Sequence, residues 1–171
     1  VFSCSSLRFT PAVQEIAKGN TVGKVLGADT FSPCIIEKTH TDLFWYGIHG
    51  VETLFTIMGK GCRQVVRTHQ EGTDVVVGTW QDGRIGTFRG TRTGQYDLGG
   101  TAFGEKGNNH FSAEGGYEPL LKEIVQFFKT GVPPVAAEET IEICAFMEAA
   151  DESKRLGGVP VALEKVMAKV K

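Results

Sequence analysis

The residue types that carry out acid–base chemistry in proteins gather between Thr39 and Glu52, in the stretch Thr-His-Thr-Asp-Leu-Phe-Trp-Tyr-Gly-Ile-His-Gly-Val-Glu. His49 falls in the second turn of a predicted helix, near an N-terminus whose partial positive charge disfavours an imidazolium. A neutral imidazole in that position could accept a proton from a substrate hydroxyl near neutral pH. The alternative is a half-buried histidine whose ring nitrogens bond to backbone groups, and the sequence leaves both interpretations open.

His40 and Asp42 lie just before this helix and are candidate substrate-binding residues. The alternative is that Asp42 is only a helix cap and that His40 is a solvated loop residue. A metal site in this stretch is not expected, because the spacing of its histidines and carboxylates matches no known set of metal ligands.

A third candidate, Arg89, lies in a strand predicted from Arg84 to Arg92. Side chains alternate between the two faces of a strand, so Arg89 shares a face with Thr87 and Thr91. Arg89 could hold a hydroxyl or carboxylate of a ligand, or it could pair with a carboxylate at a subunit interface. The sequence does not separate these two roles.

The helix that must position His49 is predicted to begin with Asp42 as its cap and to run to about Met58, with Gly59 as its stop. Its apolar residues recur at steps of four and three, the period of a helix with one buried face: Phe44, Ile48, Val51, Phe55 and Met58. The face that carries His49 flanks this stripe. We therefore expect His49 at the border of the core, where a pocket wall could be.

Helix and strand patterns fill the rest of the chain. Helices are predicted at Pro11–Lys18, Tyr117–Thr130, Glu138–Leu156 and Val161–Val170, and strands at Val22–Phe31 and at about 62–69, 73–80, 84–92 and 99–104. Runs of strands followed by runs of helices are typical of an α+β domain. We predict a single domain over residues 1–171, with an open, mostly antiparallel β-sheet and helices packed on one face.

Composition and charge restrict the partners and the cofactor. The net charge of -2 comes without a basic patch, so we expect neither nucleic acid nor a membrane surface as a partner. No Gly-x-Gly-x-x-Gly opens a helix after a strand, so the chain alone is expected to bind a dinucleotide poorly. Because the chain begins with Val1 rather than methionine, we expect a piece of a longer protein, cytoplasmic by default, with any export signal upstream.

Several segments together resemble a known family. The stretch Tyr46-Gly-Ile-His-Gly-Val-Glu-Thr-Leu-Phe-Thr-Ile-Met-Gly59 resembles a helix that opens the substrate site in the C-terminal domain of the glucose-fructose oxidoreductase, inositol dehydrogenase and rhizopine-catabolism (Gfo/Idh/MocA) family. Residues 74–87 resemble the central hairpin of that domain, and residues 117–131 and 148–158 resemble its two late helices. The order and spacing of these segments make the resemblance specific, and it extends through the whole chain.

The resemblance implies the substrate-binding and oligomerisation domain of an oxidoreductase that uses NAD or NADP and acts on a sugar, a polyol or a derivative. A Rossmann domain that binds most of the cofactor would precede it, so this chain alone is expected to be inactive. His49 matches the family histidine that acts in proton transfer or holds the substrate hydroxyl while hydride moves. The open sheet face is implied to form homo-oligomers.

One position departs from the family pattern. Many members have an aspartate four residues before this histidine, where this chain has Trp45, so a carboxylate that would orient the imidazole is missing. Asp42 or Tyr46 would have to replace it. Trp45 and Tyr46 could instead stack against a sugar face, which suits a carbohydrate-like substrate. The departure keeps two alternatives open: a non-catalytic family member used for assembly or ligand sensing, and a stand-alone domain that binds a small ligand.

Overall fold

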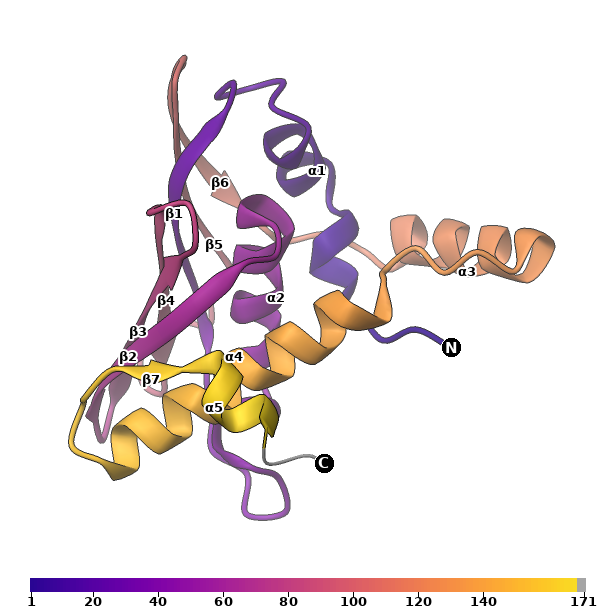
Figure 1. The fold of residues 1–171 in the computed structure, drawn as a ribbon. Helices are drawn as coiled ribbons and strands as arrows, with labels where there is room; N and C mark the ends of the chain where they lie inside the picture. Colours follow the sequence, from indigo (N-terminus) through magenta and orange to yellow (C-terminus); the bar gives the residue numbers. More distant parts are fainter. Residues whose placement is uncertain (169–171) are drawn as a thin grey trace.

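A seven-stranded sheet forms the frame of the domain in the computed structural model, which describes residues 1–168 (Figure 1). The strands are β1 (Val25–Pro33), β2 (Cys62–Gln70), β3 (Thr73–Trp80), β4 (Ile85–Thr91), β5 (Gly99–Gly104), β6 (Gly107–Ser112) and β7 (Val161–Ala162). Their order across the sheet is β6-β5-β1-β4-β3-β2-β7. Only β1 and β4 pair in parallel among these strands, so the predicted open, mostly antiparallel sheet is confirmed.

Most of the helices cover one face of this sheet (Figure 1). They are α1 (Pro11–Ala17), α2 (Gly47–Met58), α3 (Glu118–Thr130), α4 (Ala137–Arg155) and α5 (Leu163–Met167), with short 3-10 turns η1 (Ser6–Phe9) and η2 (Asp42–Phe44). Helix α2 packs over β1 and β4, and α4 packs over β2. The core lies between these helices and the sheet, where Phe55, Phe88 and Phe146 are fully buried. The predicted α+β class is therefore confirmed.

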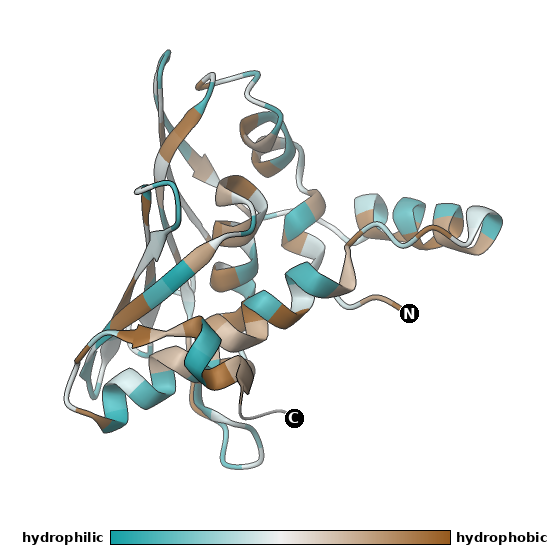
Figure 2. Ribbon diagram, viewed as in Figure 1, coloured by the Kyte–Doolittle hydropathy of each residue, from teal (hydrophilic) through white to brown (hydrophobic). Residues whose placement is uncertain are grey.

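Helix α3 stands apart from the rest of the domain (Figure 1), and none of its residues is buried. Figure 2 shows its hydrophobic residues along one side of the helix. Within residues 1–168, no helix is long and apolar enough to cross a membrane.

The sequence patterns missed strands β6 and β7. Strand β6 is polar and lies at the sheet edge, where only Phe111 is buried, so it carries no alternating apolar pattern. Strand β7 has two residues, Val161 and Ala162, which pair with β2, and α5 therefore starts later than the predicted helix at Val161–Val170. Residues 169–170 of that prediction lie outside the described residues.

The start of α2 differs from the prediction. Asp42 belongs to the separate turn η2, and α2 begins at Gly47 with no side-chain cap bond from Tyr46. His49 is therefore in the first turn of α2 rather than in the second. Gly50 lets the helix lie directly on the sheet, because a Cβ at this position would be 2.4 Å from the ring of Phe88.

Asp42 does not cap α2 because its carboxylate binds a buried cation. The guanidinium of Arg67, whose side chain is 0% exposed, donates from Nη2 to Asp42 at 2.9 Å and from Nε to Asp74 at 2.8 Å. Its Nη1 donates to Asp151 on α4 at 2.5 Å. Lys154 donates to the second oxygen of Asp42 at 2.8 Å. This Arg67 cluster ties the segment before α2 to β2, β3 and α4.

Burial, followed by the nearby Asp42 charge, raises the pKa of Asp151 from 3.8 to about 7. A carboxyl group with a raised pKa holds its proton more tightly in the folded state than in the unfolded state. Its contribution to stability is therefore present at low pH and is lost as the pH rises from about 4 to about 7.

We predict that Asp151→Asn removes this loss, because the amide oxygen still accepts from Arg67 while no buried charge forms. Urea unfolding of the wild type should give a free energy of unfolding that falls more between about pH 5 and about pH 8 than that of Asp151→Asn. Glu138→Gln, which removes an exposed carboxylate from the same helix, should keep the wild-type slope. Equal slopes for the wild type and Asp151→Asn would contradict the prediction.

Candidate functional site

His49 occupies the first turn of α2, half-buried, with one ring nitrogen held and the other open. Its Nδ1 lies 2.9 Å from the hydroxyl oxygen of Ser5. Its Nε2 has no hydrogen bond to any of residues 1–168. Burial lowers the pKa of His49, and the N-terminus of α2 acts in the same direction. Both effects favour the neutral imidazole over the imidazolium.

The segment before α2 places aromatic rings in a row beside His49. The ring centroids of Tyr46 and His49 are 5.4 Å apart with an edge-to-face geometry. The ring centroids of Trp45 and Tyr46 are 6.3 Å apart, and those of His40 and Trp45 are 4.4 Å apart. Trp45 and Tyr46 are both exposed. These four residues, which we call the aromatic row, form a surface that can stack against the face of a ligand ring.

Ser5 reaches His49 because a second buried ion pair fixes the N-terminal segment to α2. The backbone N–H of Ser5 donates to Glu52 at 2.6 Å, and Arg8 Nε donates to the other Glu52 oxygen at 2.8 Å. Arg8 also donates from Nη2 to Glu139 on α4 at 2.5 Å. Burial raises the pKa of Glu52, and the hydrogen bond from Arg8 opposes this rise. Glu52 thus holds Ser5 within hydrogen-bonding distance of Nδ1 of His49.

The structure brings together four of the six predicted site residues: His40, Trp45, Tyr46 and His49. Asp42 lies in the same segment, but both of its oxygens bind the Arg67 cluster, so it cannot orient His49. Arg89 is exposed on the sheet face opposite α2, since its neighbour Phe88 is the residue that points at the helix. Arg89 is therefore not part of the surface around His49, and its position favours the predicted alternative of an interface role.

Sequence reasoning missed Ser5. The serine lies 44 residues before His49. Its only local feature is that it caps the turn η1, where its Oγ accepts from the backbone N–H of Leu7. Glu52 follows His49 by three residues, a helical spacing that puts both on one side of α2, but no sequence pattern shows its ion pair with Arg8. A local pattern cannot find such contacts, because only the tertiary fold brings the two segments together.

An apolar cavity of about 500 Å³ lies nearby between η2, α4 and α5, lined by Phe44, Ile141 and Cys144 among others, but His49 is not in its wall. The prediction that His49 lies in a pocket wall is therefore not met by that cavity. No group of three His, Cys, Asp or Glu side chains within residues 1–168 is arranged to hold a metal ion.

The connections between the described strands and helices carry no dinucleotide-binding glycine motif. The connection from β1 to α2 runs through a long segment with the turn η2, and the connections before α3 and α5 contain no Gly-x-Gly-x-x-Gly. The glycine-rich turn that gives a pyrophosphate its backbone N–H cradle in dinucleotide-binding domains is therefore not among residues 1–168. The arrangement can bind a ring-shaped polar ligand on the aromatic row and place one of its oxygens at Nε2 of His49.

Solved structures with this fold include several dehydrogenases, although neither a protein-family model nor a curated protein sequence matches the chain. A probable dehydrogenase from Thermotoga maritima superimposes with a TM-score of 0.75 and 20% identity, over 94% of this chain and 64% of that one. The myo-inositol dehydrogenase of Lactobacillus casei, in complex with NAD(H) and myo-inositol, gives 0.72 and 12% over 94% and 61%. The scyllo-inositol dehydrogenase of the same organism, with NAD(H) and scyllo-inositol, gives 0.70 and 13% over 94% and 62%.

The chain spans slightly less than two thirds of the length of these dehydrogenases. It shares with them the arrangement of an open sheet covered by helices on one face. At the level of the fold, the resemblance to inositol dehydrogenases that the sequence predicted is therefore confirmed.

Proposed function

We propose that this chain is the substrate-binding domain of a nicotinamide-dependent oxidoreductase of the Gfo/Idh/MocA family that acts on a sugar, a polyol or a derivative. The observation that carries the proposal is the half-buried imidazole of His49, whose pKa is lowered by burial, at the start of α2 beside exposed aromatic rings. It occurs in a chain with the fold of dehydrogenases solved with inositol and NAD(H). That combination offers both a stacking surface and a group for a substrate oxygen.

In the proposed reaction, this chain binds and orients the substrate. Trp45 and Tyr46 stack against the apolar face of the sugar ring, and His49 assists proton transfer at the reacting oxygen or holds that oxygen in place. The nicotinamide, NAD or NADP, would supply the hydride acceptor. Since residues 1–168 contain no pyrophosphate cradle, a separate nucleotide-binding domain would hold the cofactor.

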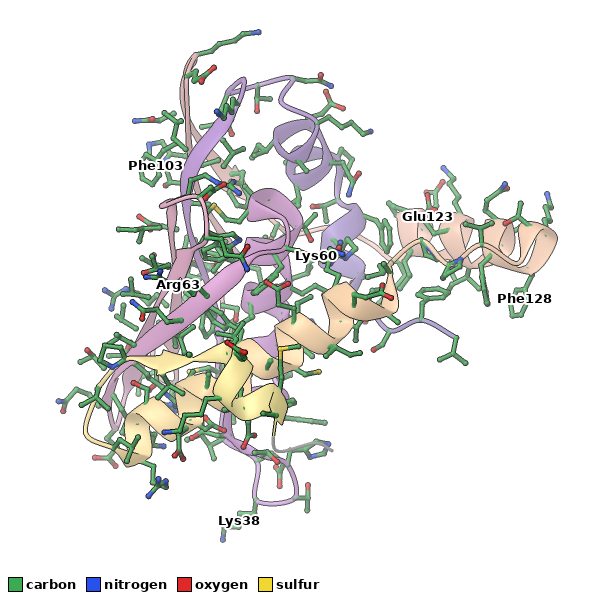
Figure 3. The ribbon with its side chains drawn as sticks, viewed as in Figure 1. Lys38, Lys60, Arg63, Phe103, Glu123 and Phe128 are labelled. Carbon is green, nitrogen blue, oxygen red and sulfur yellow. The ribbon has the colours of Figure 1, made fainter. Side chains whose placement is uncertain are left out.

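Helix α3 is the surface that we assign to that nucleotide-binding domain. Leu121, Val125 and Phe128 follow each other at helical spacing and are 56%, 51% and 80% exposed, and Figure 3 shows Phe128 projecting from the helix. The N-terminal residues run beside this helix, with the rings of Phe2 and Phe127 5.2 Å apart. A domain that precedes Val1 would therefore emerge next to the apolar side of α3 and could cover it.

The outer face of the sheet is the surface that we assign to homo-oligomers. Its side chains alternate with the buried ones along each strand and include many β-branched or aromatic residues: Phe31, Val66, Val75, Val77, Ile85 and Phe103. Figure 3 shows Phe103 on the side of the sheet away from the helices. No helix of the described chain covers this face, so a second copy would bury it.

We predict that His49→Ala in the complete enzyme lowers turnover by about 10²-fold or more, because the substrate oxygen loses its partner. Steady-state kinetics with a sugar or polyol panel measure the effect. The control is His110→Ala, since His110 is exposed on β6 at the far edge of the sheet. Near-normal turnover in His49→Ala would remove the histidine from the mechanism and favour a non-catalytic member used for assembly.

We predict that the 171-residue chain sediments as a dimer or larger assembly, and that Val77→Lys on β3 shifts it toward the monomer. A lysine there places an unpaired charge in the centre of the proposed interface. Val159→Lys is the control, because Val159 is exposed outside the sheet face. A monomeric mass for the wild type at high concentration would exclude the proposed interface.

We predict that α3 becomes protected when a nucleotide-binding domain is present. Backbone amides of α3 should exchange hydrogen roughly tenfold or more slowly in the complete protein than in the 171-residue chain, because docking suppresses fraying. Amides of α2, which is buried in the chain itself, are the internal control and should change little. Equal exchange of α3 in both proteins would rule out docking on this helix.

A further inference from the structure

Ser5 has a hydrogen-bonding arrangement that restricts the protons on His49. Its side chain is buried, and its Oγ accepts from the backbone N–H of Leu7 at 3.2 Å. The same oxygen lies 2.9 Å from Nδ1 of His49. Within residues 1–168, Ser5 Oγ has no third partner. His49 Nδ1 is therefore the one acceptor that these residues offer to the proton of the Ser5 hydroxyl.

Two arrangements of protons fit these distances. In the first, the Ser5 hydroxyl donates to Nδ1, and the neutral imidazole carries its proton on Nε2. In the second, Nδ1–H donates to Oγ, and the hydroxyl proton of Ser5 is left buried without an acceptor. An unpaired buried hydroxyl is costly, and its typical cost corresponds to a preference of about 10-fold to 100-fold for the first arrangement.

We propose that Ser5 is a positioning residue that holds His49 in the tautomer with the proton on Nε2. His49 then presents a hydrogen-bond donor to the surface beside the aromatic row. A carboxylate on Nδ1 would do the opposite, because it accepts from Nδ1–H and leaves the lone pair of Nε2 free to take a proton.

Among residues 1–168, no such carboxylate reaches the ring. Trp45 stands where many members of the resembled family have an aspartate, and Asp42 is held by the Arg67 cluster. Tyr46 contacts the ring of His49 through an edge-to-face geometry. Glu52 is nearby, but its two oxygens accept from the Ser5 backbone and from Arg8.

The consequence for the substrate rests on the proposed function. A neutral imidazole with Nε2–H donates to an oxygen lone pair, so it fits a carbonyl oxygen, or a hydroxyl held as an acceptor, directly at the reacting carbon. For His49 to take a proton from an alcohol, the Ser5 hydroxyl would first have to give up its only acceptor. The resting site is therefore built to bind and polarise a carbonyl group.

The test is the tautomer of His49 in the 171-residue chain, read from the ¹⁵N resonances of its imidazole above its pKa. In the wild type we expect Nε2 to be the protonated nitrogen. Ser5→Ala should move the ratio of tautomers toward Nδ1–H by roughly tenfold or more. Ser5→Thr keeps a hydroxyl and should restore the wild-type ratio, while His110 serves as the internal control in every spectrum.

Two outcomes would overturn the proposal: a wild-type His49 that rests as Nδ1–H, or a Ser5→Ala variant with an unchanged ratio. If Ser5→Ala fails to fold, the wild type and Ser5→Thr still decide the tautomer. The spectra do not depend on activity. A complete enzyme without hydride-transfer activity would refute the proposed function and leave the role of Ser5 standing, whereas a contrary tautomer in an active enzyme would refute only that role.

Discussion

The buried guanidinium of Arg67 is the constraint on which the arrangement of the site depends. A cation without exposure to solvent must be paired on each side, because an uncompensated buried charge is strongly destabilising. The carboxylates of Asp42 and Asp74 compensate the charge of Arg67, and the carboxyl group of Asp151 accepts its third hydrogen bond. The segment before α2 is therefore held against the sheet and α4. The chain enters α2 at Gly47, so the first turn of α2 places His49 beside Tyr46.

A second buried ion pair, between Arg8 and Glu52, anchors another segment to α2. Glu52 on α2 binds Arg8, which in turn binds Glu139 on α4, and the N-terminal segment is thereby fixed in place. His49 contacts both anchored segments, through Ser5 of the N-terminal segment and Tyr46 of the segment before α2. The ion pairs Arg67–Asp42 and Arg8–Glu52 thus position the neighbours of His49 without a hydrogen bond to its ring.

Local periodicity was enough to predict the strands β2 to β5 and the apolar stripe of α2, because each depends on side chains that alternate or recur within one element. It failed where tertiary contacts compete with local ones. Asp42 is a residue type that often caps helices, but its two oxygens accept hydrogen bonds from Arg67 and Lys154 instead. Helix α2 therefore begins at Gly47. Arg89 was assigned to a strand correctly, yet only the register beside Phe88 decides which face it occupies.

Three independent features around His49 act in one direction. Burial and the N-terminus of α2 both lower its pKa, and a serine partner adds no negative charge that would raise it again. A carboxylate in the place of Ser5 would favour the imidazolium and the opposite tautomer. Many members of the resembled family have an aspartate at the position of Trp45. Trp45 brings no negative charge that would raise the pKa of His49, and its exposed indole extends the aromatic row.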